Sequence, residues 1–325
     1  MADSRNSLPD EPVLRSLSAC LARHVRSGPE FTIAYSGGLD STVLLHAAQR
    51  SAAASDAKLS ALHIHHGLSP NADAWAGHCA RQCASLNIRL DVIHLRIENN
   101  KGEGLEGAAR VARLQALLGH SSGWILMAHH ANDQAETVLH NLLRGAGPRG
   151  MAAIPEVRGR VLRPLLHIPG DHLLAYARDH DLKWVDDESN DDRHFTRNYL
   201  RHEVLPVFEK RFPGSVDQLA AVARRFAETQ DLLDQLALAD LGAARFEFPV
   251  PLDRFRELPE LRARNLMRSL LSHQGVQLPG ERRLNEFVRQ LRSAGSDRHP
   301  CLCLVGYTLR VGAGMLNFSS GHDLL

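Results

Sequence analysis

The chain has 325 residues, of which 44% are hydrophobic and 23% charged, and its formal net charge is +1 at pH 7. This length predicts two domains, and the composition is typical of a soluble globular protein. No apolar run reaches membrane-spanning length, and the N-terminus lacks the apolar core of a signal peptide, so we expect a cytoplasmic protein. Five cysteines without a Cys-x-x-Cys pair argue against a disulfide framework and against metal sites built on paired cysteines.

The first two thirds of the chain alternate between predicted helices and strands. Leucines at helical spacing from 14 to 21 predict a first helix, and residues 31–34 predict the first strand. The later predicted strands and helices cover residues 59–63, 75–86, 88–95, 105–118, 124–128 and 133–143. This alternation predicts an α/β fold with a parallel sheet and helices on both faces.

The last third of the chain predicts a smaller module after a long helix. A helix at 197–212 ends at a Pro-Gly pair, and residues 215–241 then predict one long helix. Two helices and two strands follow, at 261–272, 282–291, 301–304 and 307–311. We therefore expect a catalytic domain over 1–212, a helical linker over 213–245 and an α+β module over 246–325.

A glycine-rich loop connects the first strand to the next helix. It consists of Ser36, Gly37, Gly38, Leu39, Asp40 and Ser41. A helix N-terminus favours an anion, glycines allow close backbone approach, and the two serines add hydroxyl donors, so the loop predicts a phosphate site. Asp40 is a poor neighbour for phosphate and is better explained as a ligand of a divalent cation. The loop lacks the Walker A lysine and resembles the signature of PP-loop ATP pyrophosphatases, which split ATP between the α and β phosphates.

A second acidic site follows the strand at 124–128. Asp133 and Glu136 fit a capping box, which would explain both acids without catalysis. Opposite a phosphate loop, we favour Asp133 as a second carboxylate that holds Mg²⁺ together with Asp40. Ligands bind beyond the carboxyl ends of parallel strands, so the loops that begin near residues 36, 65 and 129 are expected to meet in one place.

Several charged groups have two interpretations each. Arg110 and Arg113 share a helix face and would either bind phosphate or form surface ion pairs. The acidic run at 184–192 is either a surface loop or a pocket for a cationic amine, and the arginines after it would face phosphate or a base. Residues 254–292 contain nine arginines against four acids, which predicts either a phosphate-backbone surface or a solvated helix face.

Two further patterns carry little functional weight. Residues 145–150 fit Gly-x-Gly-x-x-Gly but follow a helix instead of a strand, so they do not predict a dinucleotide site. The nineteen histidines lack the spacing of a zinc motif, so we expect no transition-metal site.

Motifs over about residues 30–212 resemble the tRNA(Ile)-lysidine synthase family, in the family's order. They are Ser-Gly-Gly-Leu-Asp-Ser at 36, His-His-Gly-Leu-Ser at 65, Glu-Gly-Ala-Ala-Arg-x-x-Arg at 106, His-His-x-x-Asp-Gln-x-Glu-Thr at 129, Arg-Gly-x-Gly at 144, Arg-Pro-Leu-Leu at 163, Trp-x-Asp-Asp-Glu-Ser-Asn-x-Asp at 184 and Arg-Asn-x-x-Arg at 197. The last two are the most specific, because the PP-loop also occurs in sulfurtransferases, amidotransferases and synthetases. Residues 215–325 resemble the family's linker and small tRNA-binding module more weakly. Longer members continue with a further C-terminal domain, so we expect either a short form or part of a longer protein.

The resemblance implies a reaction in two steps. ATP with Mg²⁺ adenylates the C2 carbonyl oxygen of the wobble cytidine in an isoleucine tRNA with a CAU anticodon, and the amine of free L-lysine then displaces AMP. Decoding changes from AUG to AUA, and charging changes from methionine to isoleucine. ATP, Mg²⁺, the tRNA and lysine are the implied cofactors and partners, and a homodimer is kept open. The alternatives are a 2-thiolating PP-loop enzyme or a synthetase that adenylates a small molecule.

The resemblance also implies roles for particular residues. Those implied to bind ATP are Ser36, Gly37, Gly38, Leu39, Asp40, Ser41 and His65. Those implied to act in catalysis are Asp40, Asp133, Arg110, Arg113 and Glu136. Those implied to contact tRNA or lysine are Asp186, Asp187, Asn190, Arg197, Arg201, Arg262 and Arg264. Either Glu136 or the Asp186 and Asp187 pair would receive the lysine proton.

Overall fold

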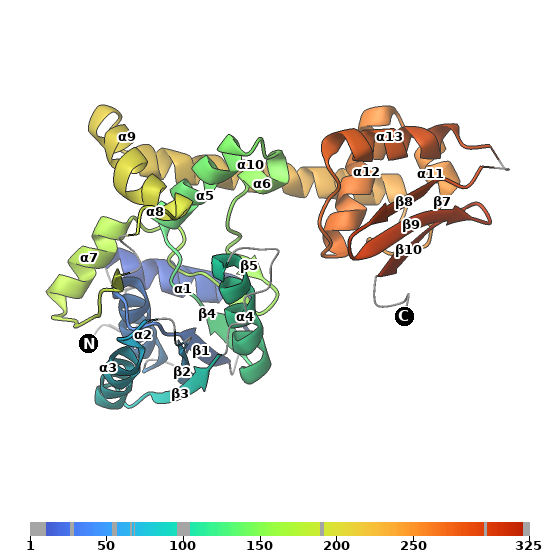
Figure 1. The fold of residues 1–325 in the computed structure, drawn as a ribbon. Coiled ribbons are helices and arrows are strands. Elements are labelled where there is room, and N and C mark those ends of the chain that lie inside the picture. Colours follow the sequence, from blue (N-terminus) through green and yellow to red (C-terminus); the bar gives the residue numbers. More distant parts are fainter. Residues whose placement is uncertain are drawn as a thin grey trace, which may run out of the picture. The chain divides into compact units, whose positions relative to one another are not determined.

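The computed structural model describes most of the chain as two compact units (Figure 1). The described residues are 11–26, 29–53, 57–65, 67, 69–95, 105–188, 192–295 and 298–320, with only the backbone of 105–110. The units are Met1–Ala227 and Glu228–Leu325, and the boundary falls inside helix α10 (Ser215–Leu241). No helix among the described residues is both long and apolar enough to span a membrane.

The first unit is built on a six-stranded sheet, which confirms the predicted α/β fold. Its strand order is β3 (Arg89–His94), β2 (Lys58–His65), β1 (Glu30–Ala34), β4 (Trp124–Leu126), β6 (Val161–Leu162) and β5 (Val157–Arg158). All neighbours are parallel except β5 and β6. Because β1 lies between β2 and β4, the loops that follow these three strands emerge side by side, as predicted.

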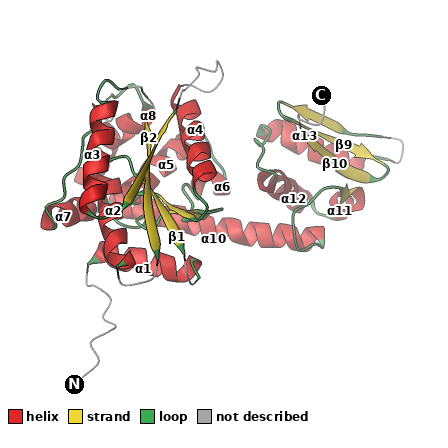
Figure 2. Cartoon of the chain, turned by 90° about the horizontal axis from the view of Figure 1, so that it is seen from below, coloured by secondary structure: helices red, strands yellow, loops and turns green. Residues whose placement is uncertain are grey.

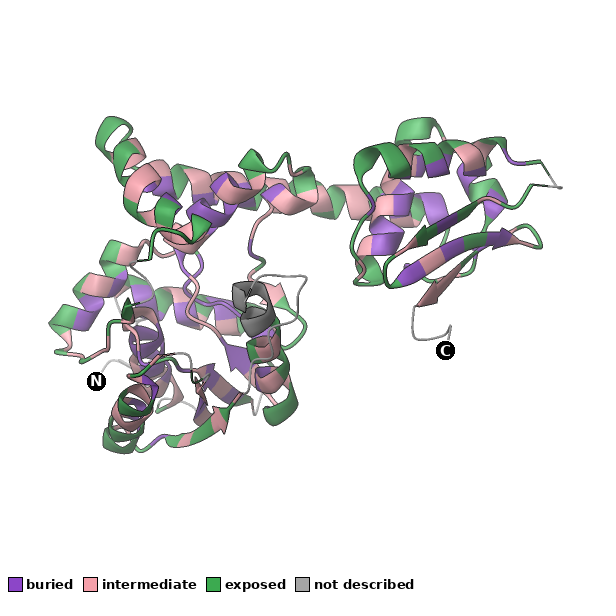
Figure 3. Ribbon diagram, in the orientation of Figure 1, coloured by how far each residue is buried: buried purple, intermediate pink, exposed green. Residues whose placement is uncertain are grey.

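Helices cover both faces of this sheet (Figure 2). On one face, α1 (Pro12–His24), α2 (Leu39–Ala52), α3 (Ala72–Ser85) and α7 (Gly170–Asp179) enclose a core that includes Ile33 of β1. On the other face, Leu117 of α4 (Leu105–His120) packs on Leu62 and Ile125. Figure 3 shows buried residues along the strands and on the helix sides that face them. Helix α7 and strands β5 and β6 were not predicted from the sequence.

A further helical layer contains α5 (Ala131–Leu143) and the first half of α10. Ala135 of α5 packs with Leu200, Leu205 and Ala220. The short helix α6 (Pro148–Met151) follows α5 in the chain. The helix predicted at 197–212 is present as three consecutive pieces, α8 (Thr196–Tyr199), the π-helical turn η2 (Leu200–Val204) and α9 (Leu205–Arg211). Such π turns change which side chains face a neighbour.

The second unit is an α+β module with its own core. Its antiparallel sheet has the order β7 (Val250–Pro251), β10 (Met315–Ser320), β9 (Tyr307–Gly312) and β8 (Cys301–Leu304). Three helices pack with this sheet, namely α11 (Leu252–Glu257), α12 (Glu260–His273) and α13 (Glu281–Ser293). The helices α12 and α13 and the strands β8 and β9 were predicted, whereas α11, β7 and β10 were not.

Candidate functional site

The loop from Ser36 to Ser41 leaves β1 and enters α2 with its backbone tightly held. Gly37 has φ of +87°, a conformation that side chains disfavour. The Ser36 backbone N–H donates to Ser41 Oγ (3.3 Å), and Ser41 Oγ donates to the Gly38 carbonyl (3.0 Å). Gly38 is the N-cap of α2 and receives no side-chain cap, so backbone donors of the first turn remain available to an anion.

Gly37→Ala is expected to damage this loop, whereas Gly38→Ala is the matched control. A Cβ at Gly37 would lie 2.8 Å from Cys79 Sγ and 3.3 Å from Val185 Cγ2, in addition to the strain of φ +87°. At Gly38 the closest atoms are 3.6 and 3.8 Å away, and φ is −74°. We expect Gly37→Ala to cost roughly 1–3 kcal/mol of stability and to raise the KM for ATP. Thermal unfolding and ATP titration check this; an equal loss of stability in both variants would contradict it.

The N-terminus of α5 corrects one interpretation of the sequence. Asp133 does not act as an N-cap toward Glu136; the N-cap is His130, and Asp133 occupies the N3 position. Asp133 Oδ2 accepts the His130 backbone N–H (2.9 Å), and His130 Nδ1 accepts the Asn132 backbone N–H (3.3 Å). A histidine ring nitrogen replaces the usual serine or threonine oxygen in this cap. For this reason the sequence did not indicate His130 as the start of the helix.

His130 lies between the two acids that were expected to hold a metal. Its Nε2 is 3.4 Å from Asp40 Oδ2 and 3.7 Å from Asp133 Oδ2. Burial lowers the pKa of this imidazole, but the hydrogen bond to Asp40 and the charges of both carboxylates outweigh burial and raise the pKa to about 9. Burial alone would raise the pKa of Asp133, and the positive charge of His130 instead lowers it. His130 was not among the expected site residues.

The chemistry of this cluster fits Mg²⁺. Asp40 and Asp133 bring two carboxylates to a single imidazole, and the side chain of Asp40 remains 41% exposed beside the phosphate loop. Carboxylate oxygens are the ligands that Mg²⁺ uses together with substrate phosphates. Because Nδ1 of His130 accepts the Asn132 backbone N–H, Nε2 is the ring nitrogen that faces the two carboxylates.

An ion pair between half-exposed Arg201 and buried Glu136 lies next to Asp133. Arg201, on η2, donates through Nε to Glu136 Oε1 (2.6 Å) and through Nη2 to Asp133 Oδ1 (3.3 Å). Glu136 is only 1% exposed; burial raises its pKa, and the charge of Arg201 opposes this rise. Arg197 makes a weaker contact with the Thr137 hydroxyl (3.4 Å). Glu136 and Arg201 are therefore engaged with each other, and both lie next to Asp133.

The acidic run after α7 passes directly along the phosphate loop. The Val185 backbone N–H donates to the Gly37 carbonyl (3.0 Å). Glu188 Oε1 accepts a hydrogen bond from the side-chain amide of Asn71 (2.7 Å), at the start of α3. Between these two anchors lie Asp186, which is exposed, and Asp187, which is half-buried. This segment of the site is contributed by residues about 150 positions away from the loop in sequence.

The remaining predicted residues of the first unit are less closely assembled. His65, at the end of β2, contacts Asp73 Oδ1 through Nε2 (3.0 Å) and packs against the His94 ring. Arg113 is on α4, whereas the side chain of Arg110 and all of Asn190 lie outside the described residues.

Arg262 and Arg264 belong to the second unit, where acids already pair with them. Arg262 forms a two-pronged ion pair with Asp240 of α10, whose side chain is completely buried. Arg264 is 3.5 Å from Glu260 Oε1. The contacts of Arg262 therefore join α12 to the end of α10.

Arg262→Ala is expected to destabilise the protein. The variant leaves the completely buried Asp240 carboxylate without its partner, so the Tm should fall. Arg289→Ala is the control, because its pair with Glu286 (2.8 Å) is exposed and should contribute little to stability. Thermal unfolding of the full chain checks this. An unchanged Tm for Arg262→Ala would contradict this and would mean that Arg262 is only a surface cation.

The fold and the phosphate loop define a PP-loop ATP-binding protein, and the PP-loop domain model matches residues 9–208. The model of the TilS substrate binding domain matches residues 251–316. The tRNA(Ile)-lysidine synthase of Nitrosomonas europaea is 37% identical over 331 residues, which cover 100% of this chain and 72% of that protein. The chain belongs to the tRNA(Ile)-lysidine synthase family.

Other relatives agree with this assignment. The tRNA(Ile)-lysidine synthase of Alkalilimnicola ehrlichii is 46% identical and that of Pseudomonas aeruginosa 42%, over 87% and 95% of this chain. The chain spans 65% and 73% of the length of these two proteins. Among solved structures, the U34-tRNA thiolase NcsA from Methanococcus maripaludis superposes with a TM-score of 0.57 at 18% identity, covering 66% of this chain and 78% of that one. This last likeness concerns the fold alone.

Proposed function

We propose that this protein ligates free L-lysine to C2 of the wobble cytidine of an isoleucine tRNA with a CAU anticodon, through an ATP-adenylated cytidine. The observation that carries the proposal is the meeting of the phosphate loop with Asp40, His130 and Asp133, in a chain of this family. The product, lysidine, would change decoding from AUG to AUA and charging from methionine to isoleucine. We expect the reaction in the cytoplasm, where the tRNA and lysine are available.

In the first step, ATP would bind at the carboxyl ends of β1, β2 and β4. Backbone N–H groups at the start of α2 and the hydroxyls of Ser36 and Ser41 would bind the phosphates. Asp40 and Asp133 would hold Mg²⁺, which when bound neutralises charge on the departing pyrophosphate. Arg113, with Arg110, would lie near the α-phosphate, where a guanidinium stabilises the charge that develops.

The second step needs a place for the lysine amine, which must lose its proton before it attacks C2. Of the two candidates, we favour the Asp186 and Asp187 pair over Glu136. The carboxylate of Glu136 is 1% exposed and already occupied by Arg201, whereas the two aspartates follow Val185, which is hydrogen-bonded to the phosphate loop. An acidic lining would bind lysine as a cation and then accept its proton.

A labelled-lysine assay tests the proposed function. The full chain is incubated with radiolabelled lysine, ATP, Mg²⁺ and an isoleucine tRNA that carries either the CAU anticodon or a changed wobble base. We expect lysine to enter only the CAU tRNA, with release of one pyrophosphate for each lysine incorporated. No incorporation, or equal incorporation into both tRNAs, would refute the proposal and favour a thiolating enzyme or a small-molecule synthetase.

A further inference from the structure

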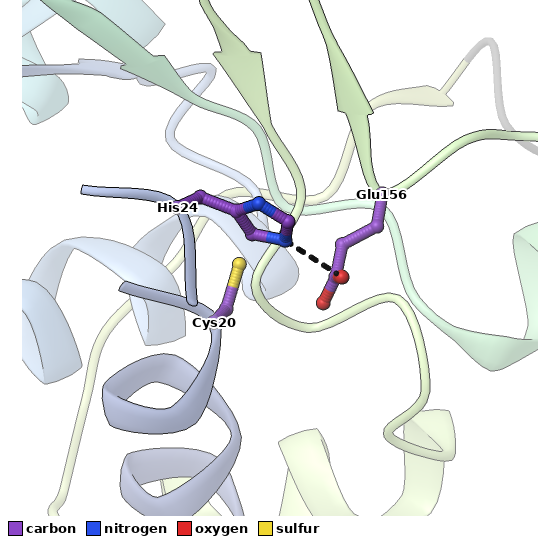
Figure 4. Close-up of side chains that lie close together, drawn as sticks. All are labelled: Cys20, His24 and Glu156. Carbon is purple, nitrogen blue, oxygen red and sulfur yellow. Dashed lines mark hydrogen bonds and ion pairs between the residues drawn. The ribbon is translucent and has the colours of Figure 1, made fainter. Parts of the chain in front are cut away.

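Outside the proposed ATP site, three side chains bring a sulfur, a nitrogen and an oxygen atom close together (Figure 4). Cys20 and His24 lie four residues apart near the C-terminus of α1 and share a helix face. Glu156 comes from the segment directly before β5. One thiol, one imidazole and one carboxylate atom lie within 4.8 Å of one another, and His24 Nε2 is 3.2 Å from Glu156 Oε2.

The surroundings of the cluster hold the carboxylate in a fixed direction. Arg23 Nη2 donates to Glu156 Oε1 (2.6 Å), so the other oxygen, Oε2, is left facing His24. Contacts of this kind orient ligands in metal sites from the outer shell. Cys20 is completely buried, and burial together with the charge of Glu156 raises the pKa of its thiol to about 12. Cys20 belongs to the apolar core, as most buried cysteines do, but its thiol also faces the Glu156 carboxylate.

We propose that Cys20, His24 and Glu156 bind one Zn²⁺ ion through Sγ, Nε2 and Oε2, with water as the fourth ligand. Sulfur, nitrogen and oxygen donors of this kind are the ligands of tetrahedral zinc, whereas Mg²⁺ requires oxygen donors alone. One thiolate and one carboxylate neutralise the dication, and the thiol proton leaves to solvent on binding. The ion would tie the end of α1 to the segment before β5.

The histidine and cysteine spacing predicts no such site, because Glu156 is 132 residues away from His24 in sequence. Only folding brings the carboxylate to the Cys-x-x-x-His pair on α1. The proposal is independent of the proposed ligase activity, since its test measures metal binding and not the modification of tRNA.

Co²⁺ titration of the full chain tests the proposal, because thiolate-bound Co²⁺ gives a sulfur-to-metal charge-transfer band. After treatment with a chelator, the chain is expected to bind one Co²⁺ with this band, and Zn²⁺ should displace it. Cys20→Ser should abolish the band, and Glu156→Gln should weaken Co²⁺ affinity at least tenfold. The double variant C301S/C303S is the matched control, because these exposed cysteines of β8, with sulfur atoms 3.6 Å apart, are the competing thiol pair.

The control should leave the band and the affinity unchanged. Absence of a thiolate band in the unmodified chain would overturn the proposal, and so would a band that survives Cys20→Ser but disappears in C301S/C303S. If Cys20→Ser fails to fold, the partly exposed Glu156→Gln variant decides by the same titration, and unchanged affinity overturns the proposal. Zn²⁺ should also raise the Tm of the unmodified chain more than that of Glu156→Gln.

Discussion

Asp133→Asn is expected to reduce pyrophosphate release and lysine incorporation by roughly 10³-fold or more. Asparagine keeps an oxygen that can accept the His130 backbone N–H, so the cap of α5 survives, but the negative charge that would hold Mg²⁺ is lost. A metal's stabilisation of phosphate charge is worth several kcal/mol in the transition state, and each 1.4 kcal/mol is about tenfold in rate. The measurement is single-turnover pyrophosphate release with saturating ATP.

The control for this variant is Asp217→Asn, another aspartate in the first turn of a helix, which is exposed on α10. It should leave turnover unchanged, within about twofold. The Tm of both variants is measured beside activity, because Asp133 also contacts Arg201. Normal turnover in Asp133→Asn would leave Asp133 as a helix-cap residue only and would remove it from the proposed metal site.

Arg201→Met is expected to destabilise the first unit by about 3 kcal/mol, or roughly 6–12 °C in Tm. The variant leaves Glu136, 1% exposed, without the guanidinium that is 2.6 Å from its carboxylate. It also removes the contact with Asp133 Oδ1, so activity should fall together with stability. Thermal unfolding and labelled-lysine incorporation measure the two effects.

Two further variants separate the ion pair from simple packing loss. Arg197→Met removes a 3.4 Å hydrogen bond to the Thr137 hydroxyl and a weaker charge interaction with Glu136, and it should cost less than about 1.5 kcal/mol. The double variant Glu136→Leu with Arg201→Met should recover much of the lost stability, because no buried charge remains unpaired. If Arg201→Met unfolds no earlier than Arg197→Met, the pair does not stabilise the protein.

The sequence predicted much of the PP-loop unit because its signals are local. The loop at 36–41 lies between an apolar strand and an apolar helix, and the alternation that follows admits one main arrangement, a parallel sheet. The short pieces were missed for the opposite reason. Strands β5 and β6 have two residues each, and neither carries a periodic pattern long enough to be recognised.

The partners of the charged residues could not be predicted in the same way. Glu136 fitted a capping box by spacing, but its partner is Arg201, 65 residues later on a π-helical turn. Arg262 looked like a surface cation in an arginine-rich stretch, yet it pairs with a buried aspartate 22 residues earlier. Spacing along the chain limits which residues share a face, but it does not say which face another element covers.

The sequence by itself determined the ATP-binding class, the parallel sheet and the family resemblance, because glycines, strand and helix periodicity and ordered motifs act over a few residues. Only the tertiary structure decided that His130 lies between Asp40 and Asp133 and that Val185 is hydrogen-bonded to the phosphate loop. It also brought Glu156 to Cys20 and His24. These contacts join groups far apart in the chain, and they exist only when burial of the core fixes the elements that carry them.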